Sequence, residues 1–160
     1  LLGHRAVDVG IDTVESFGAM VPLLFPHTAY KSYPEKWLMD RQWARMNKWL
    51  GTVSAYPIQP IETDAIAYVD DWIDRLQAVG HFISCSSGTT GKSAMLIASQ
   101  KDMDWSRIDT VQAFAWGSGV EPARDRKLIG CWPVATVPTK RLSGEAHAAA
   151  FANHHMPPFT

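Results

Sequence analysis

A loop rich in hydroxyl groups and glycine, residues 86–92, constrains this chain more than any other stretch. In order it consists of Ser86, Ser87, Gly88, Thr89, Thr90, Gly91 and Lys92. Glycine supplies the positive φ angles that a tight loop needs, and the hydroxyls and Lys92 add hydrogen-bond donors and a positive charge. Mostly apolar residues flank the loop on both sides. This pattern predicts strands over 82–85 and 94–98 that bracket an exposed phosphate-binding loop.

The ending Gly91-Lys92-Ser93 also fits the P-loop of nucleoside triphosphatases, G-x-x-x-x-G-K-[ST]. That motif opens with glycine, where this chain has Ser86, and it leads directly into a helix. Here a short apolar run, 94–98, follows the loop and is typical of a strand, while the next helix-start signal is Ser99. A flexible connector without a ligand is a third interpretation, because Ser, Thr and Gly are common in loops.

Residues 86–92 closely resemble the S-S-G-T-T-G-K phosphate loop of the adenylate-forming superfamily, which includes the acyl-CoA synthetases and adenylation domains. In that family the loop joins two strands and closes over the phosphates of ATP. The family's usual ending, Pro-Lys after the first lysine, is Ser93-Ala94 here. The missing second lysine shifts the resemblance toward the phenylacetate-CoA ligase-like and acyl-protein synthetase-like branch. It also leaves Lys92 as the only cation of the loop.

This resemblance implies an acid–thiol ligase with a small-molecule carboxylic acid as substrate and ATP, Mg²⁺ and CoA as cofactors. The acid would attack the α-phosphate of ATP to give an acyl-adenylate and pyrophosphate, and the thiol of CoA would then accept the acyl group. Residues 86–92 would be the nucleotide-binding site. Ser87, Thr89, Thr90 and the backbone around Gly88 and Gly91 would hold the β- and γ-phosphates, and Lys92 would offset the charge that grows on departing pyrophosphate.

The resemblance identifies no catalytic residue and no metal ligand in this chain. Adenylate-forming enzymes have a large N-terminal region of several subdomains and a small C-terminal domain. We therefore expect residues 1–160 to be part of the N-terminal, ATP-binding region, without the C-terminal domain and inactive alone. A non-catalytic binding module that keeps the fold is the alternative hypothesis, since the second lysine is absent.

The alternation of helices and strands predicts an α/β layered domain with a mostly parallel sheet and flanking helices. The expected helices and strand, besides those around the loop, are a helix from Pro34 to Gly51, helices over about 63–79 and 99–117, a strand over 128–135 and an Ala-rich helix over 144–153. The first helix carries Trp37, Trp43 and Trp49, whose spacing points the rings in different directions. We interpret it as a helix surrounded by its own domain, in preference to one whose tryptophan covers a pocket.

The net charge and composition limit the classes of partner that the chain is expected to bind. A net charge of −1 offers no basic field for nucleic acid, and no apolar run approaches the length of a membrane span. Cys85 and Cys131 lack metal or disulfide spacing, which agrees with a reducing cytoplasm. His147, His154 and His155 lack partners at ligand spacing, so we expect no metal site there. The sequence does not indicate an oligomeric state.

Overall fold

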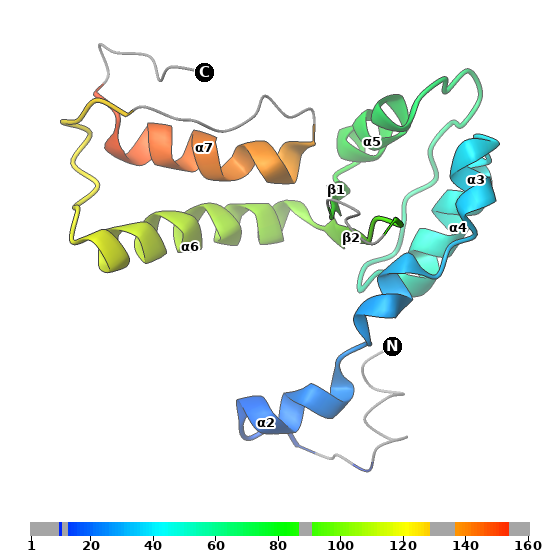
Figure 1. Cartoon of the computed structure of the whole chain (residues 1–160), viewed down its shortest axis with the longest axis horizontal. Helices are drawn as coiled ribbons and strands as arrows, with labels where there is room; N and C mark the ends of the chain where they lie inside the picture. Colours follow the sequence, from blue (N-terminus) through cyan, green and yellow to red (C-terminus); the bar gives the residue numbers. More distant parts are fainter. Residues whose placement is uncertain (1–9, 11–12, 87–90, 129–136, 154–160) are drawn as a thin grey trace.

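In the described part of the chain, helices pack around a small antiparallel sheet (Figure 1). A computed structural model describes residues 10, 13–86, 91–128 and 137–153. In chain order the elements are α2 (Phe17–Met20), the 3₁₀ helices η1 (Val21–Leu23) and η2 (His27–Lys31), α3 (Glu35–Met39), α4 (Trp43–Val53), α5 (Val69–Ala78), β1 (Phe82–Cys85), β2 (Met95–Ala98), α6 (Gln100–Ser118) and α7 (Pro138–Phe151). No helix in these ranges is long and apolar enough to cross a bilayer.

The expected layered α/β domain with a mostly parallel sheet is wrong. The described residues are 54% helical, and the described sheet has only β1 and β2, which pair antiparallel with Phe82 opposite Ala98. The physical reason is the short connection over 86–94, which suffices for a hairpin, whereas parallel neighbours need a crossover of about a dozen residues or more. The strand expected over 128–135 lies outside the described residues from Ile129 onward, and Leu128 itself is not in a strand.

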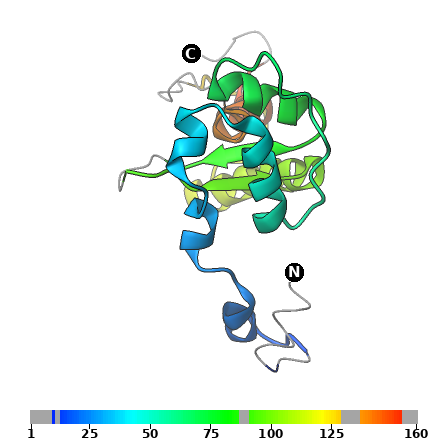
Figure 2. The same ribbon diagram turned by 90° about the vertical axis from the view of Figure 1, so that its right-hand side faces the viewer.

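The two strands that bracket the loop are confirmed, with the second beginning one residue later than expected, at Met95. Successive side chains of a strand point to opposite faces, and helices cover both faces of this hairpin. Ile83 and Met95 belong to the larger core, which α4 and α5 complete. Phe82 belongs to a second core with Met103 of α6 and Leu142 of α7. Figure 2 shows the strand pair between the cyan helices α3 and α4 and the α6–α7 pair.

Tryptophans dominate the larger core. Trp43 and Trp72 stack with ring centroids 5.6 Å apart and so connect α4 with α5. Each indole N–H has an acceptor: Trp72 Nε1 donates to Asn47 Oδ1 at 2.7 Å, and Trp43 Nε1 donates to the Ile66 carbonyl at 3.0 Å. Because a buried N–H without a partner is costly, these bonds allow large amphipathic rings to fill the core.

The helix expected from Pro34 to Gly51 is two helices, α3 and α4. Arg41, at φ +56°, adopts the left-handed conformation between them and interrupts the helix. The interpretation of a core helix is confirmed for Trp43 and Trp49, which are only 4% and 7% exposed, while Trp37 packs partly buried against the same core.

Local sequence signals predict the remaining helix boundaries with differing accuracy. α5 begins at Val69 instead of near 63, because the preceding segment contains Ala65 at φ +60°, and it ends before Gly80 at φ +84°. The helix-start signal expected at Ser99 is confirmed as a capping box, with the Ser99 N–H donating to Asp102 Oδ2 at 2.8 Å. α7 begins at Pro138, earlier than expected, because proline is well suited to a first helical turn.

Trp72→Ala should lower the free energy of unfolding by about 3–5 kcal/mol, because it removes a fully buried, stacked ring. Urea denaturation monitored by circular dichroism measures the change. Trp116→Ala is the matched control, since that ring is 90% exposed and its loss should change stability by less than about 0.5 kcal/mol. Similar losses in the two variants would contradict the placement of both rings.

His81 should make stability depend on pH. Its buried Nε2 accepts a hydrogen bond from the Gln59 N–H at 2.8 Å, and burial lowers its pKa below the ordinary value of 6.5. Protonation is therefore easier in the unfolded chain, so this contribution is present above about pH 6.5 and is lost as pH falls below it toward the folded pKa.

His81→Phe removes both the acceptor and the titration. We expect the variant to be about 1–3 kcal/mol less stable at pH 8 and its free energy of unfolding to fall less steeply between pH 7 and pH 5. Urea denaturation at several pH values gives the slopes, and an unchanged slope in His81→Phe would contradict the assignment.

Candidate functional site

The described ends of the expected phosphate loop extend the hairpin. The Ser86 N–H donates to the Ala94 carbonyl at 3.0 Å, and Ser86 Oγ accepts from the Ala94 N–H at 2.8 Å. Gly91 has φ +95°, a conformation that residues with a Cβ rarely adopt, so glycine is required there by the backbone. The loop therefore leaves β1 and enters β2 through a closed, hydrogen-bonded base.

Four of the predicted site residues, Ser87, Gly88, Thr89 and Thr90, lie outside the described residues. The described members of the predicted site are Ser86, Gly91 and Lys92. Gly91 and Lys92 line a common cavity with Ser93. Ser86 is exposed at the other end of the loop, at the end of β1.

Tyr33 holds the end of the loop through three contacts. The Lys92 ammonium lies over the Tyr33 ring, 4.2 Å from its centroid, and donates a hydrogen bond to the Tyr33 backbone carbonyl. The Tyr33 hydroxyl donates to the Ser93 carbonyl at 2.8 Å. A cation over an aromatic face is attracted by the ring quadrupole. Tyr33, which lies between η2 and α3, therefore contacts both Lys92 and Ser93 and holds them in place.

Tyr33 is itself rigidly placed. It is 1% exposed, and its ring packs edge-on against Trp49 with centroids 4.8 Å apart. Burial raises the pKa of the Tyr33 phenol, and the nearby Cys85 and Glu35 raise it further because a phenolate there would face their negative charge. The hydroxyl thus stays protonated at neutral pH and keeps its role as a donor to Ser93.

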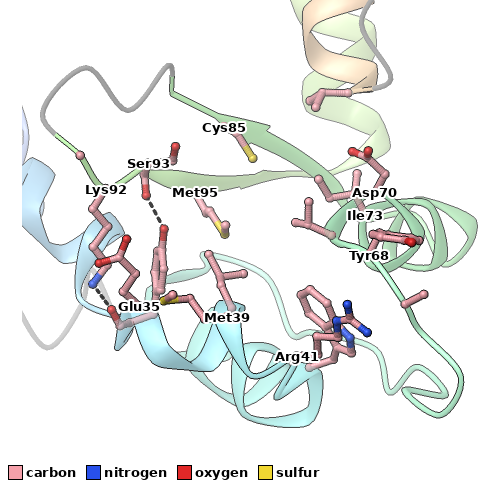
Figure 3. Close-up of a pocket in the computed structure, with 17 residues that line it drawn as sticks. Glu35, Met39, Arg41, Tyr68, Asp70, Ile73, Cys85, Lys92, Ser93 and Met95 are labelled. Carbon is pink, nitrogen blue, oxygen red and sulfur yellow. Dashed lines mark hydrogen bonds between the residues drawn. The ribbon is translucent and has the colours of Figure 1, made fainter.

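A cavity of about 550 Å³ opens beneath the hairpin, between α3 and the start of α5 (Figure 3). Its volume falls within the range of roughly 300–1,000 Å³ that is usual for small-molecule sites. Its lining residues are Tyr33, Glu35, Leu38, Met39, Arg41, Trp43, Ala67, Tyr68, Val69, Asp70, Ile73, Cys85, Gly91, Lys92, Ser93, Met95 and Val137.

The cavity has charged groups at both ends and an apolar middle. Figure 3 shows Lys92 and Glu35 at one end, Arg41 and Asp70 toward the other, and Met95 between them. The Arg41 guanidinium lies 5.8 Å from the centroid of the Tyr68 ring. Each end thus combines a cation, an acid and an aromatic ring, an arrangement suited to an elongated ligand with a polar group near Lys92.

Sequence reasoning missed Tyr33 and Glu35 as neighbours of the loop, and it missed Arg41 as a residue that lines the cavity. Tyr33 and Lys92 are separated by 59 positions, and no periodicity or spacing connects them. Pro34, next to Tyr33, is only the expected start of a helix, and the helix there does begin at Glu35. A single sequence therefore contained no indication that this tyrosine contacts the loop.

The described residues contain no group of three or more His, Cys, Asp or Glu side chains arranged to hold a metal ion. His154 and His155 lie outside the described part of the chain. The neighbouring Asp70 and Asp71 are both exposed, and Asp71 Oδ2 accepts from the Tyr68 N–H at 3.0 Å at the start of α5.

Comparisons of the chain with protein-family models, with curated proteins and with solved structures gave no match.

Proposed function

We propose that this chain supplies the phosphate-binding loop of an adenylate-forming acid–thiol ligase. The observation that carries the proposal is the sequence of residues 86–92 together with its position, since the loop connects two paired strands. The cavity beside Gly91, Lys92 and Ser93 supports it further, because a ligand seated there would lie next to the loop.

The alternative of a degenerate P-loop phosphotransferase is not supported. It requires a helix that begins at Ser93, immediately after the lysine. The chain instead continues without helix through Ser93 and Ala94 into β2 at Met95. Phosphate binding at this loop would therefore depend on backbone N–H groups, hydroxyls and Lys92, without the positive end of a helix dipole.

In the proposed reaction the carboxylate oxygen of the acid attacks the α-phosphorus of MgATP. The bond from that phosphorus to the bridging oxygen breaks, and pyrophosphate leaves with the negative charge. The thiolate of CoA then attacks the acyl carbonyl, and AMP leaves. The magnesium ion would arrive with the nucleotide as part of the substrate. Lys92 would reduce the cost of charge building up on pyrophosphate, which acts mainly in the first step.

Lys92→Ala in the full-length protein should lower the adenylation rate constant about a hundredfold, because a charge-assisted contact in a closed site contributes on the order of 3 kcal/mol to the transition state. The later thiol step should change less, since pyrophosphate has already left. Single-turnover kinetics of each half-reaction, with pre-formed acyl-adenylate supplied for the second, measures both.

Two further variants control for the contact between Lys92 and Tyr33. Lys92→Met keeps the aliphatic chain over the ring and should lose as much adenylation rate as Lys92→Ala. Lys48→Ala removes an exposed lysine of α4 and should leave both steps unchanged. Equal slowing of both half-reactions in Lys92→Met would mean that Lys92 acts through folding, and no slowing would remove the mechanistic basis of the proposal.

Residues 1–160 alone should bind ATP or pyrophosphate but should not form acyl-adenylate. In the family that the loop resembles, a C-terminal lysine and a later acidic residue complete the reaction, and we expect neither of them among residues 1–160. Acid-dependent exchange of labelled pyrophosphate into ATP, tested with a panel of aryl and fatty acids, distinguishes the cases. Exchange by the isolated chain would refute this prediction, and nucleotide binding without exchange by the full-length protein would favour a non-catalytic binding module.

A further inference from the structure

We propose that Tyr33 stores the Lys92 ammonium in the ligand-free protein and releases it when phosphate binds. This inference rests on the proposed function, since it assigns a regulator to the same site. Tyr33 would be a positioning residue, because it acts on phosphate only through Lys92. Although it lies far from residues 86–92 in the sequence, it would set the affinity of that site.

In the ligand-free chain, the contacts of Lys92 hold its charged ammonium in place. Lys92 is half-buried, and its ammonium lies over the Tyr33 ring and is hydrogen-bonded to the Tyr33 backbone carbonyl. Glu35 lines the same end of the cavity and attracts the same cation (Figure 3). The ring face, the carbonyl oxygen and the carboxylate are all electron-rich, as phosphate oxygens are. A phosphate group therefore competes with them for Lys92, and part of its binding free energy is spent on the exchange.

Tyr33 cannot follow Lys92 when the ammonium moves. Its ring is fixed against Trp49 in the core, and its hydroxyl is bonded to the Ser93 carbonyl at 2.8 Å. That hydroxyl contact does not involve the ammonium, so it can persist after Lys92 leaves the ring. The exchange then needs only rotations within the long lysine side chain, while the backbone at Ser93 and the start of β2 stay in place.

Nuclear magnetic resonance of reductively ¹³C-methylated lysines tests the exchange in the unmutated chain. Dimethylation keeps the positive charge, and methyl groups over an aromatic face resonate upfield. We expect an upfield Lys92 signal, assigned by its loss in Lys92→Arg. On titration with magnesium pyrophosphate it should move to the position of an exposed lysine such as Lys48. Isothermal titration calorimetry measures the affinity of the unmodified chain for the same ligand.

Substitutions at Tyr33 distinguish its attraction for the Lys92 ammonium from its contribution to core packing. Tyr33→Leu removes the ring that attracts the ammonium, and we expect it to bind pyrophosphate about three- to tenfold more tightly than the wild type. Tyr33→Phe keeps the ring and the backbone carbonyl, and should bind within about twofold of the wild type. If Tyr33→Leu does not fold, the titration of the unmutated chain still decides.

Each outcome has a distinct meaning. A Lys92 signal that leaves the ring as pyrophosphate binds supports the inference. Pyrophosphate binding with Lys92 still on the ring overturns the inference and leaves the proposed function intact, as does a Lys92 signal that is not upfield in the ligand-free chain. Absence of any pyrophosphate or ATP binding by calorimetry overturns the proposed function and this inference with it.

Discussion

A two-stranded hairpin is marginally stable in water, so this fold depends on helices that cover both faces of β1 and β2. Because successive side chains of a strand point to opposite faces, Ile83 and Met95 face the larger core and Phe82 faces α6 and α7. The larger core contains the stacked Trp43 and Trp72, whose N–H groups are both hydrogen-bonded. Loss of this packing would leave the hairpin, and with it the base of the loop, without support.

Tyr33 connects that core to the candidate site. Its ring belongs to the buried cluster through Trp49, while its hydroxyl and carbonyl contact Ser93 and Lys92. The pKa of the phenol lies above its ordinary value of 10.0, so the hydroxyl is protonated and donates to Ser93 over the physiological range. Packing in the core thereby determines where the cation of the loop rests, although Lys92 is only half-buried.

The cavity beneath the hairpin places Lys92 beside a space that a ligand could occupy. Lys92 lies at the boundary between the loop and a largely apolar space, with Glu35 close to it and Arg41 at the far end (Figure 3). A charge at such a boundary interacts more strongly than one in bulk water, because nearby apolar groups reduce screening. The proposed adenylation chemistry and the proposed storage of Lys92 both depend on this reduced screening of the Lys92 charge.

The sequence by itself determined the local features: the strands on either side of residues 86–92, the capping box at Ser99 and the end of α5 before Gly80. Their signals lie within a few neighbouring residues, so short-range physics decides them. The short connection over 86–94 also favours the antiparallel pairing of β1 and β2, although the predicted fold class was wrong on this point. Only the tertiary structure decided the break at Arg41 and the contact of Tyr33 with Lys92. These depend on which distant side chains share a core, and a single sequence does not contain that information in its spacing.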